Sequence, residues 1–218
     1  MKVFIIRHCE TKKNIDNKFD STATSDDLTP EGKEQLLFLC KFLNKHWENA
    51  PVIYSSPRER SVLTAKEIAE HFDTNYNIVE SLPPINPGKL AGLTEKQAIE
   101  RYPLLMDARL RFKDGLTNGY DICFPGGDSV YNYENVISER IHLLLSNNKD
   151  FILVTHRSVI LALLNIFCKQ LKGYRKDRYF YFDTPKGMIL VLNTDALGTS
   201  GNLEVIGSYE VWKKECYD

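Results

Sequence analysis

Short apolar segments that end abruptly at polar or charged residues recur along the chain. Residues 2–6, 51–56 and 150–155 each have the length of a β-strand and a nearly continuous apolar core. A continuous apolar run, rather than strict alternation, is typical of a strand that is buried on both faces of a sheet. The pattern therefore predicts three buried strands, and residues 188–192 and 203–209 predict two closing strands, the last at an edge.

Helical spacing of apolar residues separates these strands. Thr29-Pro30-Glu31 combines a hydroxyl N-cap, a proline at the first helical position and an acid in the first turn, which predicts a helix start. The apolar face of this helix runs to Trp47. Similar spacing predicts helices over residues 62–69, 130–146 and 159–171. Strands alternating with helices predict an α/β fold with a largely parallel sheet.

Two stretches lack this regular pattern. Residues 11–27 are polar and predict a loop with one helical turn. Residues 81–129 are rich in proline and glycine, and within them only Thr94–Arg101 predicts a helix, with Gln97 three residues after the Thr94 cap. Because long irregular insertions in compact domains are usually functional, we expect residues 81–129 to form a lid over the strand ends of one domain spanning residues 1–218.

Composition excludes several classes of protein. The formal net charge is −1, so there is no general attraction to nucleic acid or to a membrane surface. No apolar stretch reaches the length of a membrane span, and the start lacks the layout of a signal peptide. The five cysteines have no CxxC spacing, which favours reduced thiols in the cytoplasm, and they show no zinc-type spacing either. The oligomeric state is not predicted by any of these features.

The candidate functional residues directly follow the predicted strands. Arg7 and His8 follow the first strand, Arg58 and Arg60 follow the second, and His156 follows the third. Each could have a structural role, with Arg7 paired to a carboxylate, His8 capping the strand, and the other arginines in a solvated turn. However, ligands of open α/β sheets bind outside the carboxyl ends of the strands, where parallel strand ends lie side by side.

Two arginines, two histidines and a helix N-terminus at one sheet edge would suit a phosphoryl group. Arginine matches phosphate geometry, and a neutral imidazole can act as a nucleophile that captures a phosphoryl group. A cysteine phosphatase is a weaker alternative, because such a loop needs an arginine six residues after Cys9, where the chain has Ile15 and no glycine-rich loop. Cys9 is better explained as a small residue that fills a tight turn.

Several motifs, in order along the chain, resemble those of the histidine phosphatase superfamily, also called the phosphoglycerate mutase-like family. Arg7-His8-Cys9-Glu10-Thr11 is similar to its Arg-His-Gly-x-Thr signature, with cysteine in the usual glycine position. The other matching segments are Asn14, Leu28-Thr29 with Gly32, Ser55-Ser56-Pro57 with Arg60 and Thr64-Ala65, Gly92-Leu93-Thr94, Pro125-Gly126-Gly127-Asp128-Ser129, and Thr155-His156, although Arg157 stands where the family usually has glycine.

The resemblance implies a three-layer α/β/α sandwich with a mixed, mostly parallel sheet and no metal or other cofactor. It also implies roles for the site residues. His8 would be the nucleophile that becomes phosphorylated. Arg7, Arg60 and His156 would hold the phosphoryl oxygens, with Asn14 assisting.

One expected residue is missing from this resemblance. Aligned on Gly88 and Gly92-Leu93-Thr94, the family's general-acid glutamate falls on Pro84. Glu80 and Asp128 are the candidates to replace it. Because a general acid contributes typically 10²–10⁴-fold, its loss favours substrates with good leaving groups and counts against a mutase. The sequence therefore predicts a phosphatase of a small or peptidic phosphomonoester, or alternatively an impaired family member that binds phosphate compounds or a protein partner.

Overall fold

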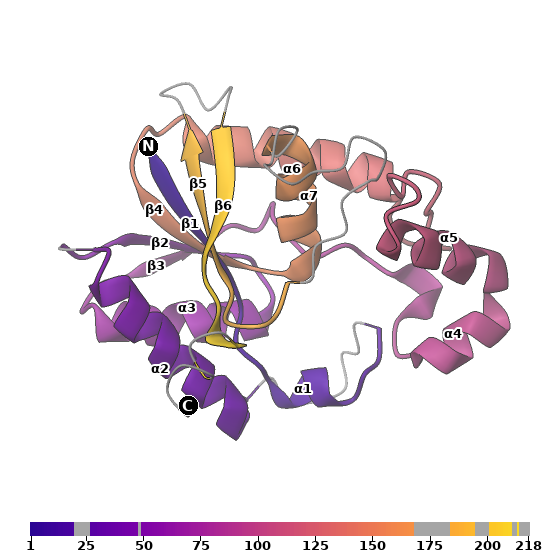
Figure 1. Cartoon of the computed structure of the whole chain (residues 1–218), viewed down its shortest axis with the longest axis horizontal. Helices are drawn as coiled ribbons and strands as arrows, with labels where there is room; N and C mark the ends of the chain where they lie inside the picture. Colours follow the sequence, from indigo (N-terminus) through magenta and orange to yellow (C-terminus); the bar gives the residue numbers. More distant parts are fainter. Residues whose placement is uncertain (20–26, 48, 168–183, 195–200, 211–212, 214–218) are drawn as a thin grey trace.

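The computed structural model describes residues 1–19, 27–47, 49–167, 184–194, 201–210 and 213. Within these residues the chain forms one six-stranded sheet in the order β3-β2-β4-β1-β5-β6 (Figure 1). The strands are β1 Lys2–Arg7, β2 Val52–Ser55, β3 Tyr76–Ile78, β4 Phe151–Thr155, β5 Ile189–Thr194 and β6 Gly201–Gly207.

The sheet is mixed, as predicted. Parallel pairing joins β1 to β4, β4 to β2 and β2 to β3, while β5 and β6 are added in antiparallel orientation beyond β1. The register pairs Arg7 with Thr155 and Ser55 with Val154. The carboxyl ends of β1, β2 and β4 therefore lie side by side, and the residues that follow them enter the same region.

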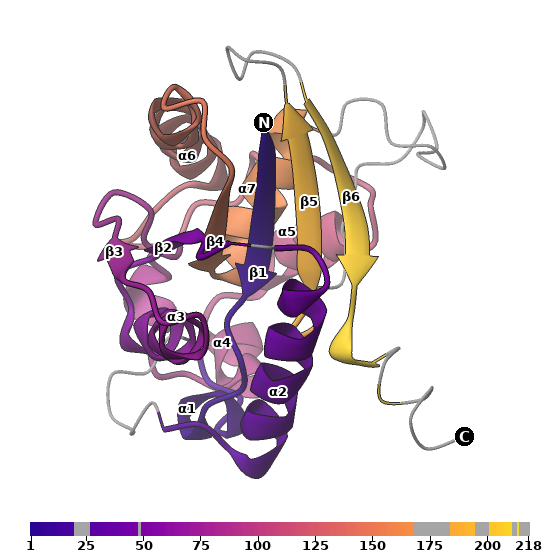
Figure 2. The same cartoon turned by 90° about the vertical axis from the view of Figure 1, so that its left-hand side faces the viewer.

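Helices cover both faces of the sheet. The helical segments of the described residues are α1 Lys12–Ile15, α2 Pro30–Asn44, α3 Glu59–His71, a short 3-10 turn η1 Gly88–Leu90, α4 Glu95–Arg101, α5 Pro103–Lys113, α6 Val130–Leu145 and α7 Arg157–Phe167. Helices α2 and α3 pack on one face and α6 and α7 on the other (Figure 2). The predicted three-layer α/β/α class is thus confirmed.

The first strand shows why its apolar run is continuous. Val3 and Ile5 join the core beneath α6 and α7, while Phe4 and Ile6 join the core beneath α2 and α3. All four side chains are fully buried. A strand in the middle of a three-layer sandwich has no solvent face, so the alternation that marks a half-buried strand is absent.

The predicted helix starts also have a local cause. The Thr29 hydroxyl accepts a hydrogen bond from the Gly32 N–H at 2.9 Å, so it caps α2 as the sequence predicts. Thr94 caps α4 in a capping box with Gln97. Helix α7 begins at Arg157, two residues earlier than expected, and residues 168–171 of that predicted helix lie outside the described residues.

The expectation that residues 81–129 contain a single helix is wrong. A second helix, α5, begins at Pro103, which occupies its first position, and the segment builds a core of its own from Leu90, Ala98, Met106, Ile122 and Phe124. Gly88 lets the two ends of this segment pack together. Its φ of +53° suits glycine, and a Cβ atom there would collide with the backbone of residues 125–127. In Figure 1, α4 and α5 lie to one side of the sheet, beyond α7.

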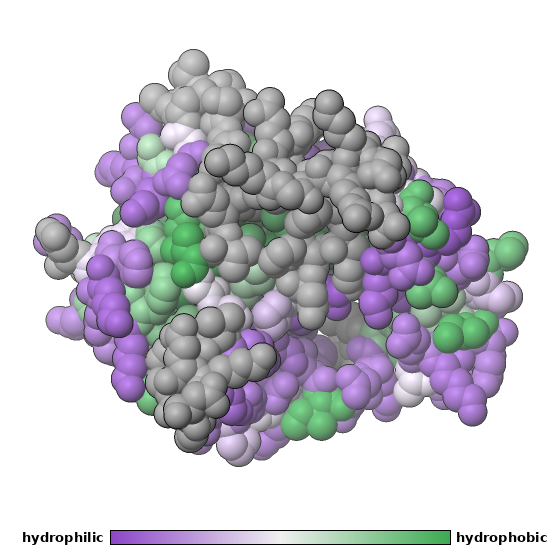
Figure 3. Space-filling model, in the orientation of Figure 1, coloured by the Kyte–Doolittle hydropathy of each residue, from purple (hydrophilic) through white to green (hydrophobic). Residues whose placement is uncertain are grey.

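The surface is mostly polar. On the described part of the face seen in Figure 3, hydrophilic residues dominate, and hydrophobic residues show in several separate places, among them the end formed by α4 and α5. Leu104 on α5 is 86% exposed and Leu110 is 55% exposed. Among the described residues, none of the helices combines the length and apolar character that crossing a membrane requires.

Candidate active site

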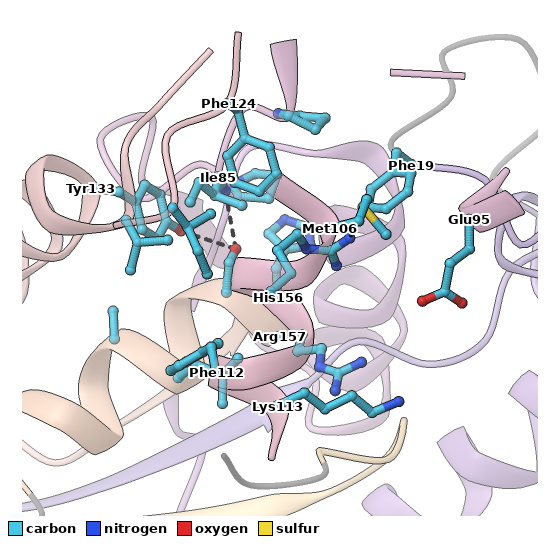
Figure 4. Close-up of a pocket in the computed structure, with 18 of the residues that line it drawn as sticks. Phe19, Ile85, Glu95, Met106, Phe112, Lys113, Phe124, Tyr133, His156 and Arg157 are labelled. Atoms are coloured by element: carbon cyan, nitrogen blue, oxygen red, sulfur yellow. Dashed lines mark hydrogen bonds between the residues drawn. The ribbon is translucent and has the colours of Figure 1, made fainter. Parts of the chain in front are cut away.

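A cavity of about 820 Å³ opens at the carboxyl ends of the central strands (Figure 4). The sheet and its flanking helices contribute Arg7, His8, Arg60 and His156 to its lining. The opposite wall comes from residues 84–124, including the helices α4 and α5. The fold therefore brings the four strand-end residues together in one cavity, beneath the segment proposed from the sequence as a lid.

The turn after β1 is held from two sides. The His8 N–H donates to the Thr155 carbonyl at 3.0 Å, which extends the pairing with β4 beyond the end of the strand. The Arg7 N–H donates to the Met188 carbonyl at 3.1 Å, and the Arg7 guanidinium donates to the Thr184 carbonyl. The two backbone bonds fix the turn at the carboxyl end of β1, and the guanidinium bond also holds the Arg7 side chain.

His8 is held as a neutral imidazole with one free nitrogen lone pair. The side chain is 3% exposed, and its Nδ1 lies 2.8 Å from the Cys9 carbonyl oxygen. Because a carbonyl only accepts, Nδ1 carries the proton of the neutral ring and Nε2 keeps its lone pair. Burial lowers the pKa of His8 well below 6.5, and the charges of His156, Arg7 and Arg60 lower it further.

His156 faces His8 across the site. The two ring centroids are 5.2 Å apart in an edge-to-face arrangement. The Nε2 of His156 lies 3.2 Å from the Ser61 hydroxyl, whereas its buried Nδ1 has no hydrogen-bond partner in the described part of the chain. Burial, followed by the charges of Arg60, Arg58 and Arg7, lowers the pKa of His156 well below 6.5. If the Ser61 hydroxyl donates to Nε2, the neutral ring carries its proton on Nδ1, and a ligand with a hydrogen-bond acceptor would then satisfy this buried nitrogen.

The two arginines that follow β2 differ in their placement. Arg60, the second residue of α3, is 8% exposed and lines the cavity. Arg58 is the exposed N-cap residue of α3 and does not line the cavity. The alternative that both arginines lie in a solvated turn is therefore wrong for Arg60, because that side chain is buried at the start of α3.

Cys9 is buried beneath the turn. Its side chain is fully inaccessible, its N–H donates to the Thr64 hydroxyl at 3.1 Å, and burial raises the pKa of the thiol to about 12. A thiol that stays protonated is a poor nucleophile. The environment of Cys9 is that of the small turn-filling residue predicted from the sequence.

Asn14 also borders the cavity, from the short helix α1. Its side-chain carbonyl accepts hydrogen bonds from the Thr11 N–H at 3.1 Å and from the Thr11 hydroxyl at 3.2 Å. These bonds occupy the oxygen of the side-chain amide and fix its orientation. The amide NH₂ group is the end of Asn14 that could donate to a ligand.

Sequence reasoning missed several cations of the cavity, among them Lys186. Its ammonium lies 3.1 Å from Glu10 Oε2, and the other oxygen of that carboxylate accepts from the Thr29 hydroxyl at 2.9 Å. Burial lowers the pKa of Lys186, the Glu10 carboxylate opposes this effect, and Arg7 adds to it. Gly32 allows the arrangement, since it packs directly on the Glu10 backbone and leaves no room for a Cβ atom. Lys186 and Glu10 are 176 positions apart in the sequence, so no local sequence pattern could have predicted that they form a pair.

Pro84 lines the cavity, but neither candidate for a replacement acid does. Glu80 is exposed outside the cavity, and an Asp128 oxygen accepts from the Asn86 N–H at 2.7 Å. The backbone around Pro84 is anchored instead, because the Tyr133 hydroxyl donates to the carbonyl of residue 83 at 2.8 Å and Ser158 Oγ accepts from the N–H of residue 85 at 3.0 Å. The carboxylates in the lining are Glu95, Asp107 and Glu134.

The chain is similar, in sequence and in fold, to several known phosphatases. Phosphoserine phosphatase 1 of Hydrogenobacter thermophilus is 26% identical over 203 residues, which cover 88% of this chain and 92% of that protein. The α-ribazole phosphatase of Shigella flexneri superposes with a TM-score of 0.73 at 18% identity, over 96% of this chain and 97% of that one. A mycobacterial glucosyl-3-phosphoglycerate phosphatase superposes with a TM-score of 0.71 at 16% identity, over 94% and 97% of the two chains.

The family itself is established by the sequence match. The family model described as the histidine phosphatase superfamily (branch 1) matches residues 3–199, which is nearly the whole chain. The match includes both strand-end histidines and confirms the kind of enzyme predicted from the sequence, a histidine phosphatase hydrolase. The chain therefore belongs to the histidine phosphatase superfamily, branch 1.

Proposed function

We propose that this protein hydrolyses phosphomonoesters through a phosphohistidine intermediate on His8. The observation that carries the proposal is the state of His8, a buried neutral imidazole whose Nδ1–H is committed to the Cys9 carbonyl. His8 lines the cavity together with Arg7, Arg60 and His156, and its Nε2 lone pair would be available to a substrate there. A neutral nucleophile surrounded by fixed cations suits attack on a phosphoryl dianion.

The reaction would proceed in two displacements. In the first, the Nε2 lone pair of His8 forms a bond to phosphorus while the bond to the ester oxygen breaks, and the released oxygen takes a proton as the alcohol leaves. In the second, water attacks the phosphorus and loses a proton, the bond to Nε2 breaks, and phosphate leaves with His8 neutral again. The net reaction consumes one water and gives one alcohol and one phosphate.

The other residues would stabilise the charge that spreads over the phosphoryl oxygens. Arg7 and Arg60 provide fixed guanidinium donors, and the unpaired Nδ1–H of His156 provides a third. The Asn14 amide group would assist at the rim of the site. Ser61 supports this role by binding the far nitrogen of His156, which favours the Nδ1–H tautomer when the hydroxyl donates.

The leaving group sets the range of substrates. With Pro84 in the place of a general acid, the released oxygen depends on its own acidity or on solvent for its proton. We therefore propose that good leaving groups, such as phenols, are cleaved much faster than alkyl alcohols. A mutase is disfavoured for the same reason, because it must both donate and accept this proton.

The substrate would be a small or peptidic phosphomonoester, handled in the cytoplasm without nucleic acid as a partner. The relative from Hydrogenobacter thermophilus is named a phosphoserine phosphatase, which makes phosphoserine a first compound to assay. A second candidate function, binding of phosphate compounds without turnover, is favoured by the Pro84 position alone.

Hydrolysis of p-nitrophenyl phosphate across pH tests the proposal, because this substrate needs little help from an acid. We expect turnover by the wild-type protein and its loss in His8→Ala. His71→Ala is the matched control, since His71 is exposed on α3 and lies outside the cavity. Turnover that survives His8→Ala would contradict the proposed mechanism. Phosphate binding by calorimetry without any turnover would support the second candidate.

A further inference from the structure

The segment that leads into β5 holds Arg7 by three hydrogen bonds. The Arg7 guanidinium donates to the Thr184 carbonyl, and the Arg7 N–H donates to the Met188 carbonyl at 3.1 Å. The Arg7 carbonyl accepts from the Gly187 N–H at 3.3 Å. Since β5 pairs with β1, residues 184–188 lie directly against the end of β1 (Figure 2). This segment therefore sets the position of an arginine that lines the cavity.

Lys186 lies in the middle of this segment and forms an ion pair with Glu10. The Lys186 ammonium is 3.1 Å from Glu10 Oε2, and the two side chains are only 16% and 27% exposed. Glu10 is itself fixed, because its other carboxylate oxygen accepts from the Thr29 hydroxyl at 2.9 Å and its N–H donates to the Gln35 side-chain carbonyl at 2.8 Å. The ion pair thus joins the segment before β5 to the turn after β1.

The charges of this ion pair act on Arg7 in opposite ways. Burial lowers the pKa of Lys186, the Glu10 carboxylate opposes this effect, and the charge of Arg7 adds to it. Lys186 is therefore within electrostatic range of both Glu10 and Arg7. A carboxylate competes with a phosphoryl group for a guanidinium, because arginine binds both with the same forked geometry. An ammonium that binds the Glu10 carboxylate reduces this competition.

We propose that Lys186 is a positioning residue for Arg7: by binding Glu10, it keeps this carboxylate from drawing the guanidinium away from the phosphoryl group. This inference rests on the proposed function and adds to it a residue that acts through Arg7. Without the ammonium, the Glu10 carboxylate would attract the Arg7 guanidinium, and residues 184–188 would lose their link to the turn after β1. Only the first of these effects disappears when the charge of Glu10 is removed as well.

Calorimetric titration with inorganic phosphate tests the inference, because phosphate occupies the phosphoryl site and binding requires no turnover. We expect Lys186→Gln to weaken phosphate affinity about tenfold, as for the loss of one charge-assisted hydrogen bond. Lys186→Arg, which keeps a cation beside Glu10, should weaken it less. The double variant Glu10→Gln with Lys186→Gln should recover most of the wild-type affinity, because a neutral amide does not attract Arg7. A purely structural ion pair would give no such recovery.

Lys12→Gln is the matched control. Lys12 pairs with Asp27 at the same distance of 3.1 Å, but both side chains are exposed and neither residue lines the cavity. Wild-type phosphate affinity in Lys186→Gln would overturn the inference, and so would equally weak affinity in the single and double variants. The proposed function is tested separately, by whether p-nitrophenyl phosphate hydrolysis depends on His8, so either proposal can fail while the other stands.

Discussion

Placing an acid at position 84, where the family resemblance leads us to expect a glutamate, tests the proposed mechanism most informatively. Hydrogen bonds hold the backbone on both sides of this position. The Tyr133 hydroxyl donates to the carbonyl of residue 83 at 2.8 Å, and the N–H of residue 85 donates to Ser158 Oγ at 3.0 Å. Pro84 itself is partly buried and borders the cavity. A glutamate placed there would therefore extend from a fixed backbone position in the cavity wall.

The expected gain follows from what proton donation contributes. A positioned acid accelerates such reactions typically 10²–10⁴-fold, which corresponds to about 3–5 kcal/mol of activation free energy. Since the surroundings of residue 84 have not been adjusted to a carboxyl group, we expect Pro84→Glu to give the lower value, roughly 100-fold, with an alkyl phosphate such as phosphoserine. The loss of proline should lower the free energy of unfolding by only about 1 kcal/mol.

The assay compares kcat/KM for phosphoserine and for p-nitrophenyl phosphate in the wild type, Pro84→Glu and Pro84→Gln. Glutamine matches glutamate in size but has no acidic proton to transfer. We expect a gain with phosphoserine only in Pro84→Glu, and little change with p-nitrophenyl phosphate, whose leaving group needs no proton. Equal phosphoserine turnover in Pro84→Glu and Pro84→Gln would refute the view that a missing acid limits this enzyme.

Three further outcomes follow from the structure. Thr29→Val removes the cap of α2 and a bond to the Glu10 carboxylate, so it should lower the free energy of unfolding in urea by about 2–3 kcal/mol, with Thr29→Ser costing less than half as much. The free energy of unfolding should also decrease as pH falls below about 6.5. The reason is that both histidines take up protons in the unfolded chain, whereas buried His8 and His156 have lowered pKa values and stay neutral. Replacing both, with His8→Gln and His156→Gln, should flatten this pH dependence. Cys9→Ser should keep p-nitrophenyl phosphate turnover within a few-fold of wild type, since the thiol pKa of about 12 excludes a thiolate role, and abolished turnover would contradict this.

The sequence predicted the central part of the fold because its signals are local. The apolar runs of β1, β2 and β4 are continuous, since both faces of each strand meet helices, and Thr29 marks the start of α2. The meeting of Arg7, His8 and His156 follows from parallel pairing alone, because Arg7 and Thr155 are register partners.

The elements that were missed lack such signals. Strand β3 has only three residues and is largely exposed, so its length and pattern do not distinguish it from a loop. Helix α5 has no single apolar stripe, since Leu104 and Leu110 face solvent and Met106 alone is buried. The Lys186–Glu10 pair depends on tertiary packing that no periodicity encodes.

Direct detection of the phosphoenzyme tests the central claim most sharply. The wild-type protein would be mixed with p-nitrophenyl phosphate, quenched in alkali, which preserves phosphohistidine, and digested for mass spectrometry. The account predicts one phosphoryl group on the peptide that contains His8, absent in His8→Ala. A phosphoryl group on another residue, or continued turnover without any phosphoenzyme, would contradict it.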